Sequence, residues 1–384
     1  MTLPEVIDWD PTSPQIQHND KTAYDEVRGR CPVAHAANGS WTVLAHPEAL
    51  EVLHQDGVYS SAVSRYPSVP NGMDLPEHTP FRRVVDEFYH PARMRAFEHI
   101  CRRIVRNLLR QIVPGQQLDL MDAFARPFAN EVQCAFMGWP SSLHIPLQEW
   151  VQKNQVATRA QDRDAMSAVA LEFDSVIRDQ LAARRSGEIP FHDVTWELMQ
   201  ARVNDRGLTD DEIVSIIRNW TVGELGTIAA SVGIMANFLA ERPHEADNLR
   251  ELLKQGRDLA SATDEILRIT SPFISSRRKT TEEANLGSRS IPAGSRVNVN
   301  WASANRDETV FGDPDVFDLS RDPSANLLYG AGIHVCPGKP LAQLELRIVL
   351  EELLTTFSQF TVATTPTPAQ FPASGFTVLE MILS

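Results

Sequence analysis

The stretch LLYGAGIHVCPGKPLAQLELR, residues 327–347, carries the strongest signal in the chain. Its glycines Gly330, Gly332 and Gly338 allow positive φ angles and let the backbone approach a flat ligand closely. Cys336 precedes a run with helical spacing, so it faces free N–H groups and the positive end of a helix dipole, which favour a thiolate. A thiolate held in this way is a soft ligand for iron. A glycine-rich turn with a structural cysteine is the alternative interpretation.

The composition of the 384-residue chain is that of a globular protein, with 42% hydrophobic and 22% charged residues. The formal net charge of −14 argues against non-specific nucleic-acid binding, which needs a basic surface. No run approaches roughly 18 uninterrupted apolar residues and the start lacks a signal-peptide pattern, so we expect no membrane span and a cytoplasmic location.

The scattered Cys31, Cys101, Cys134 and Cys336 show no CxxC spacing and no disulfide framework.

Amphipathic helical periodicity dominates the sequence. Examples are residues 94–113, 165–184 and 339–357. One helix has a clear start, because Thr209 and Glu212 form a capping box before an apolar pattern that continues to Leu239. At about 30 residues this helix is long for a globular protein, and we expect it to cross the core.

Strand patterns are few and short. Alternating apolar and polar residues predict half-buried strands over residues 40–46 and 295–303. The sequence has no internal repeat and no linker rich in glycine and serine. We therefore predict a mainly α fold with small β-sheets, organised as a single domain over residues 1–384.

The cysteine stretch closely resembles the signature of the cytochrome P-450 family, Phe-Gly-x-Gly-x-His-x-Cys-x-Gly followed by a Leu-Ala-x-x-Glu helix. The matching residues are Tyr329, Gly330, Gly332, His334, Cys336, Gly338, Leu341, Ala342 and Glu345. The resemblance implies one triangular-prism helical domain with a long central helix over haem b. It also implies that Cys336 is the axial thiolate of the haem iron, with Gly330, His334 and Gly338 among the cofactor-binding residues.

Further matches to the family extend over nearly the whole chain. Glu265 and Arg268 lie i, i+3 on one helix face, where an isolated pair is worth little. In the family this Glu-x-x-Arg pair is buried and tied to an arginine in a later proline-rich loop, and Arg321 stands at that position. The runs ANRD at 304–307 and PDVFDLSR at 314–321 also match family consensus.

The resemblance assigns three further residues to the haem propionates. His78, Arg82 and Arg278 stand at the family's propionate-contacting positions, where a dianionic porphyrin edge needs charge-assisted donors. Each residue alone is equally consistent with a solvated surface position. The family often places another histidine before the cysteine loop, and here the residue is Asn326, so that contact is weaker or missing.

The long helix contains NWTVGELGTIAAS, residues 219–231. In the family this helix carries an acid and a threonine that pass protons to dioxygen above the iron. Two registers are possible, and the distance to Pro243 selects Thr227. Gly226 then occupies the usual acid position and Glu224 a usual glycine position. Three interpretations of Glu224 follow: a general acid acting from a shifted place, a group that orients a cationic or hydroxylated substrate, or a structural hydrogen-bonded carboxylate.

The resemblance also outlines an apolar substrate pocket. Its expected lining residues are Val63, Met73, Gly223, Phe273, Ile274 and Phe376. Such walls suit a small or medium hydrophobic substrate, fixed by few polar groups. Each of these residues is also consistent with an ordinary core position.

The sequence contains no flavin or nicotinamide domain, so we expect electrons from a separate ferredoxin and its reductase. Arg102, Arg103, Arg106 and Arg110 recur on one helix, and Lys339 follows the cysteine. They form either a docking face for an acidic ferredoxin or a solvated helix face.

The leading expectation is a monomeric monooxygenase that hydroxylates or O-dealkylates its substrate, without nucleic-acid or membrane partners. A peroxygenase or another atypical haem-thiolate catalyst is the alternative within enzymes, motivated by the displaced acid. A non-catalytic haem-binding or ligand-binding protein is the alternative from another class.

Overall fold

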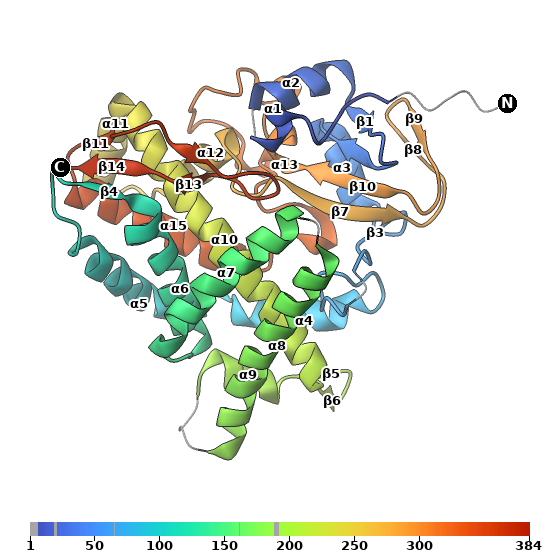
Figure 1. Cartoon of the computed structure of the whole chain (residues 1–384), viewed down its shortest axis with the longest axis horizontal. Coiled ribbons are helices and arrows are strands. Elements are labelled where there is room, and N and C mark those ends of the chain that lie inside the picture. The colour runs from blue at the N-terminus through green and yellow to red at the C-terminus, as the bar shows by residue number, and fades with distance from the viewer. Residues whose placement is uncertain (1–6, 19–20, 65, 161, 188–191) are drawn as a thin grey trace.

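The computed structural model describes residues 7–18, 21–64, 66–160, 162–187 and 192–384. Its central element is the long helix α10 (Asp210–Glu241), around which the other helices are arranged (Figure 1). The capping box predicted from the sequence is confirmed: the Thr209 hydroxyl accepts a hydrogen bond from the Glu212 amide at 3.2 Å, and the Glu212 carboxylate accepts one from the Thr209 amide at 2.8 Å. Both bonds satisfy amides at the helix start that have no intrahelical partner.

The apolar character of α10 is that of a core helix. By length and composition alone α10 could cross a membrane, but 72% of its most apolar window is buried inside the molecule. Pro243 begins the next helix, α11 (Pro243–Lys254), and marks the end of α10. The buried middle of α10 therefore packs against other helices.

The helices next to α10 make the main core. α10 packs on α6 (Arg126–Met137) and α15 (Lys339–Thr356), and α5 (Pro91–Leu109) packs on both of these helices. The remaining α-helices are α1 (Pro14–Gln17), α2 (Lys21–Arg30), α3 (His46–His54), α4 (His78–Phe88), α7 (His144–Ala160), α8 (Arg163–Ser186), α9 (Val194–Gln200), α12 (Ala260–Ile269), α13 (Trp301–Ala304) and α14 (Glu308–Phe311).

The strands form one mixed sheet and several small ones. The five-stranded sheet has the order β1-β2-β10-β7-β3, with β10 parallel to β2 and the other neighbours antiparallel. Its strands are β1 (Val33–His35), β2 (Trp41–Val43), β3 (Tyr59–Ser60), β7 (Ser275–Thr280) and β10 (Arg296–Asn300). The smaller sheets contain β4 (Gln117–Asp119), β5 (Arg202–Val203), β6 (Arg206–Gly207), β8 (Ala284–Leu286), β9 (Arg289–Ile291), β11 (Phe360–Val362), β12 (Thr367–Pro368), β13 (Phe376–Val378) and β14 (Glu380–Leu383).

The predicted fold class, mainly α with small β-sheets, is confirmed. The predicted strand at 40–46 is shorter in the structure, because His46 already begins α3. The predicted strand at 295–303 ends at Asn300, whose side chain accepts the Ser303 amide at 2.9 Å and caps α13. The expectation of a single domain over the whole chain stays a prediction.

Candidate active site

The cysteine loop folds tightly between the five-stranded sheet and α15. Gly330 and Gly332 have φ angles of 72° and 68°, which glycine adopts without strain. A Cβ on Gly332 would lie 2.1 Å from the backbone oxygen of Leu53, so only glycine fits there. The Cys336 amide donates to the Tyr329 carbonyl at 2.8 Å and closes the loop. The glycines thus let the loop pass directly beneath α3.

The surroundings of Cys336 favour the neutral thiol over the thiolate, although the residue is accessible to solvent. Cys336 is accessible to solvent, yet enough protein surrounds its Sγ that burial is the largest influence and raises its pKa. The amides of Gly338 and Lys339 and the charge of Arg82 act in the opposite direction. The helix start thus favours the thiolate, as the sequence predicts, but in the protein alone burial has the larger and opposite effect on the pKa. A bound metal cation supplies the charge that holds such a thiol deprotonated.

Arg82 on α4 supports the cysteine loop from one side. Its guanidinium donates to the carbonyls of Ile333 and Val335 at 3.1 and 2.6 Å, and its Nε donates to Asp86 at 2.7 Å. The side chain is mostly buried. Arg82 therefore fixes the backbone just before Cys336, a contact that the sequence pattern did not predict.

Three buried cationic or donor side chains near the loop have unused hydrogen-bonding capacity. Among the residues that the structure describes, neither ring nitrogen of His78 has a hydrogen-bond partner, and Nε2 of His334 has none. The two rings pack edge to face with centroids 4.6 Å apart. Arg278 on β7 is 8% exposed, and among the described residues its guanidinium donates only to the neighbouring Arg277 carbonyl, at 2.9 Å. Within the described ranges no carboxylate pairs with Arg278, so this cluster is suited to an anionic ligand.

Asn326 and Tyr329 differ from the family pattern and make local contacts instead. The Asn326 amide donates to the Asp264 carbonyl at 3.0 Å and its oxygen accepts the Leu328 amide at 2.9 Å. The Tyr329 hydroxyl donates to the Asp264 carboxylate at 3.1 Å, which also accepts from Gln343 at 2.7 Å. Both substitutions therefore tie the cysteine loop to α12 and α15.

A buried ion-pair cluster lies behind the loop. Arg268 donates to both oxygens of Glu265 at 2.8 and 2.9 Å, and Arg321 donates to the same carboxylate at 3.1 Å. Arg268 also donates to the carbonyls of Asn305 and Pro314 at 3.0 and 3.1 Å. The cluster therefore attaches α12 to the proline-rich loop that precedes Cys336.

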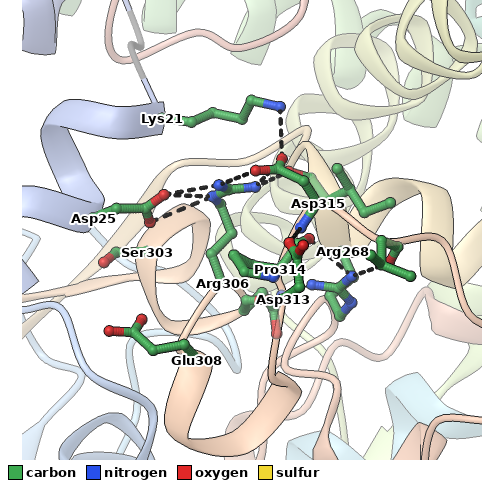
Figure 2. Close-up of polar contacts among 12 residues, drawn as sticks. Lys21, Asp25, Arg268, Ser303, Arg306, Glu308, Asp313, Pro314 and Asp315 are labelled. Atoms are coloured by element: carbon green, nitrogen blue, oxygen red, sulfur yellow. Dashed lines mark hydrogen bonds and ion pairs between the residues drawn. The ribbon is translucent and has the colours of Figure 1, made fainter.

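A second network beside this cluster is centred on Arg306 (Figure 2). The guanidinium of Arg306, 3% exposed, lies between Asp25 at 2.7 Å and Asp315 at 2.9 Å. Lys21 approaches Asp315 at 3.6 Å. This network connects α2 near the N-terminus with the proline-rich loop, although the two segments are far apart in the sequence.

The predicted proton-transfer segment of α10 is accessible on one face. Gly223 is exposed, and Gly226 and Thr227 are half-buried. A Cβ on Gly223 or Gly226 would meet nothing within 4 Å. Glu224 is half-buried near this face, and its carboxyl group is in hydrogen-bonding contact with that of Glu345 on α15. This contact favours the proton-handling interpretation of Glu224 over one in which it binds substrate.

Five of the six predicted pocket residues have accessible surface. Val63 and Phe273 are 38% and 47% exposed, and Gly223, Met73 and Phe376 are exposed or half-buried. The prediction that Ile274 lines the pocket is corrected. Its side chain is 2% exposed and packs with Tyr24 and Val27 in a core cluster under α2. Phe273, which is 47% exposed, therefore does not share its surroundings with the buried Ile274.

The arginines of α5 differ in their charge balance. Arg102 pairs with Glu351 and Glu352 at 2.7 Å each, and Arg106 pairs with Glu352 at 2.8 Å. In the part of the chain that the structure describes, no carboxylate pairs with Arg103 or Arg110. These side chains border a shallow depression lined by His99, Arg102, Arg103, Arg106, Asn107 and Arg110.

Comparison with known proteins identifies the family. The sequence model described as cytochrome P-450 matches residues 98–381, which is more than half of the chain. The chain belongs to the cytochrome P-450 family. As a cytochrome P-450 it is a monooxygenase that binds haem iron through a cysteine thiolate. Cys336 of the signature loop supplies that thiolate, and the buried donors His78, His334 and Arg278 fit the two acidic groups of the porphyrin.

Relatives of this cytochrome P-450 include hydroxylases. The erythromycin C-12 hydroxylase of Saccharopolyspora erythraea is 30% identical over 351 residues, covering 88% of this chain and 86% of that protein. The linalool 8-monooxygenase of Pseudomonas putida is 28% identical, covering 94% and 93%. A solved structure of a mutant of P-450 EryK in complex with erythromycin B matches with a TM-score of 0.87 at 27% identity, covering 96% and 97%. The predicted cytochrome P-450 fold is confirmed.

One functional contact was missed in the sequence. Glu345 appeared there only as a residue of the Leu-Ala-x-x-Glu helix, without a partner. Its contact with Glu224 joins helices that are 121 positions apart at these residues, from 224 to 345. The available signal was the unusual carboxylate at a glycine position of α10, because such a carboxylate needs a partner when it is buried.

Proposed function

We propose that this cytochrome P-450 inserts one oxygen atom of O2 into a C–H bond of a small or medium hydrophobic substrate. The net reaction takes the substrate, O2, two electrons and two protons to the hydroxylated product and water. Accessible apolar side chains carry the proposal, because Val63, Phe273 and Val222 of α10 are 38%, 47% and 44% exposed. Relatives named as a hydroxylase and a monooxygenase support the reaction type.

The haem contacts follow from the charges around the loop. Cys336 would hold the iron, and His78, His334 and Arg278 would donate hydrogen bonds to the propionates. Arg82 stabilises the loop carbonyls and adds positive charge beside Cys336. When bound, the haem supplies the redox chemistry and the activation of oxygen.

Residues of α10 deliver the protons for the reaction. Thr227 lies on the accessible face, three residues after Glu224, so both residues share one side of the helix. Burial raises the pKa of Glu224 to about 7, so it can carry a proton near neutral pH. Glu224 thus acts as a proton donor in place of an acid at Gly226, and Thr227 positions the transferred proton.

Electrons come from a separate acidic carrier such as a ferredoxin with its reductase. The unpaired Arg103 and Arg110 at the rim of the α5 depression provide positive charge for docking, while Arg102 and Arg106 are neutralised by α15 carboxylates. We further propose a cytoplasmic protein that acts as a monomer.

The deciding experiment is the carbon-monoxide difference spectrum of the reduced protein, followed by a substrate screen for a spin-state shift. We expect the thiolate-type spectrum in the natural protein and its loss in Cys336→Ser. Turnover is then measured with O2 and a reductant, and separately with hydrogen peroxide alone. Turnover only with peroxide would favour the peroxygenase, for which the glycine at position 226 is the supporting observation. Thiolate ligation without turnover under either condition would contradict the enzymatic proposal.

A further inference from the structure

The helices α10 and α15 pack on each other (Figure 1). Each contributes one carboxyl group to their contact, the half-buried Glu224 and the buried Glu345. Glu345 is fully buried, and neither of its oxygens receives a hydrogen bond from an N–H or hydroxyl donor. Oε1 of Glu224 is likewise buried and without a donor. The two carboxyl groups are in hydrogen-bonding contact with each other. Such a contact requires a proton on one of them, because two carboxylates only accept.

The groups around this acid pair do not balance its charge. Tyr89 after α4, Cys101 on α5 and Cys336 in the loop face it, and all three are neutral or anionic. The nearest arginines on α5 and α15, Arg102 and Arg347, are engaged by other carboxylates. Those carboxylates are Glu98, Glu351 and Glu352. Among the described residues no lysine or arginine pairs with Glu224 or Glu345.

Electrostatics in this setting favour a protonated pair. Burial is the main cause that raises the pKa of both groups, and the neighbouring Glu224 charge raises the pKa of Glu345 further. Two carboxyl groups that share a water-poor site cannot both ionise easily, because like charges repel strongly at low dielectric. The first ionisation leaves one proton hydrogen-bonded between them, as in other paired carboxyl sites.

We propose that Glu224 and Glu345 share one proton and form the proton reserve of the oxygen-activating helix, replacing the acid that is missing at Gly226. The proton leaves a carboxyl oxygen of Glu224 towards the Thr227 side of α10. The pair is left with one more negative charge, which a proton from water later neutralises. Glu345 is a positioning residue, since it acts through Glu224. This inference rests on the proposed monooxygenase function.

The first test measures the shared proton without turnover. Infrared difference spectra of the haem-loaded protein should show a protonated-carboxyl band at pH 7 that shifts in frequency in Glu224→Gln, because the proton then stays on the buried Glu345 without its carboxyl partner. In Glu345→Gln the remaining Glu224 should lose its proton at a lower pH than in the natural protein, because an amide replaces the like-charged neighbour. Glu241→Gln, at the exposed end of the same helix, should leave the band unchanged. A band that is absent at pH 7, or unaffected by both pair variants, would overturn the proposal.

The second test measures product formed per reduced nicotinamide consumed. Glu345→Gln should lower this ratio about tenfold or more, the scale of a general acid, while the thiolate spectrum stays intact. Adding Gly226→Asp should restore the ratio, since a side chain there meets nothing within 4 Å. Equal ratios in the natural protein and Glu345→Gln would contradict the proton reserve. Absence of product from the natural protein would instead contradict the proposed function, and the infrared result would still judge the acid pair.

Discussion

At the scale of single residues, charge balance distinguishes Arg278 from Arg82 near the cysteine loop. Arg82 has a carboxylate partner, Asp86, and two loop carbonyls, whereas Arg278 is buried with one backbone carbonyl. Burial therefore lowers the pKa of Arg278. A buried cation without a counter-ion destabilises a fold, and the same cation contributes favourably once an anion binds.

We accordingly predict opposite effects of Arg278→Met on the haem-free and haem-bound protein. The variant should unfold at a higher temperature than the natural chain when haem is absent, because an unpaired charge is removed. It should bind haem about tenfold more weakly, since one charge-assisted donor is lost. Haem titration and thermal unfolding measure the two effects, with the exposed Arg277→Gln as control. Weaker stability in both states would indicate a purely structural role.

Single residues also show what the sequence can and cannot predict. Cys336, the capping box at Thr209 and the Glu265–Arg268 spacing follow from local patterns, and their geometry appears as the patterns indicate. The prediction for Ile274 was wrong because the sequence pattern did not specify whether this side chain faces the pocket or the core. The Glu224–Glu345 contact could not be predicted, since it depends on how two helices cross. The pKa of Cys336 depends on the balance between burial and helix amides, which no motif provides.

At the scale of elements, α12 is attached to the proline-rich loop through one carboxylate. Glu265 receives hydrogen bonds from Arg268 and Arg321, and the Asp318 amide donates to the same group at 3.2 Å. The side chains of Glu265 and Arg268 are 7% and 1% exposed, so water cannot replace the lost contacts. Glu265 is thus one of the anchors of the loop that leads to Cys336, beside the Arg306–Asp315 pair and the contacts of Asn326 and Tyr329 with Asp264.

Glu265→Gln should lower the free energy of unfolding by about 3 kcal/mol, because it leaves two arginines without their shared counter-ion in a buried site. The matched control is Glu251→Gln, which has the same i, i+3 spacing to Lys254 but lies on the surface. That control should change stability little. Urea unfolding monitored by circular dichroism measures both variants. Similar losses of unfolding free energy in Glu265→Gln and Glu251→Gln would refute the role of burial.

The contact between α2 and the proline-rich loop should depend on acid pH. Hydrogen bonding to Arg306 is the main cause that lowers the pKa of Asp315 from 3.8 to about 2 in the folded protein. The contribution of Asp315 is therefore present above pH 4 and disappears as the pH falls from about 4 to 2. The stability difference between the natural chain and Asp315→Asn should shrink over this range. In an Arg306→Gln background the pH dependence of that difference should vanish.

At the scale of the whole molecule, a strongly acidic chain has arginines without a carboxylate partner, among the described residues, at the depression beside α5. The formal net charge is −14, so an acidic electron carrier is repelled by most of the surface. Arg103 and Arg110 offer a local exception, whereas Arg106 is neutralised by Glu352. Long-range repulsion combined with a local attractive site orients an approaching partner.

The double variant Arg103→Gln, Arg110→Gln should slow reduction by an acidic ferredoxin about tenfold at low salt. The difference should diminish as salt is added, because exposed charges are screened beyond about 10 Å at 0.1 M. Arg106→Gln is the control with an already paired charge, and its effect should be smaller. Stopped-flow reduction kinetics at two salt concentrations measure the rates. Equal rates in all three proteins would place the docking site elsewhere.

The close approach of Gly332 to Leu53 has a consequence for segment exchange between related chains. The atom that excludes a side chain at 332 is a backbone oxygen, which every amino acid provides. Recombination that joins an N-terminal part from one relative to a C-terminal part from another therefore keeps this fit, whatever residue stands at 53. For this contact a chimera needs only glycine at 332, so the fit between residues 53 and 332 places no limit on crossover points between the two positions.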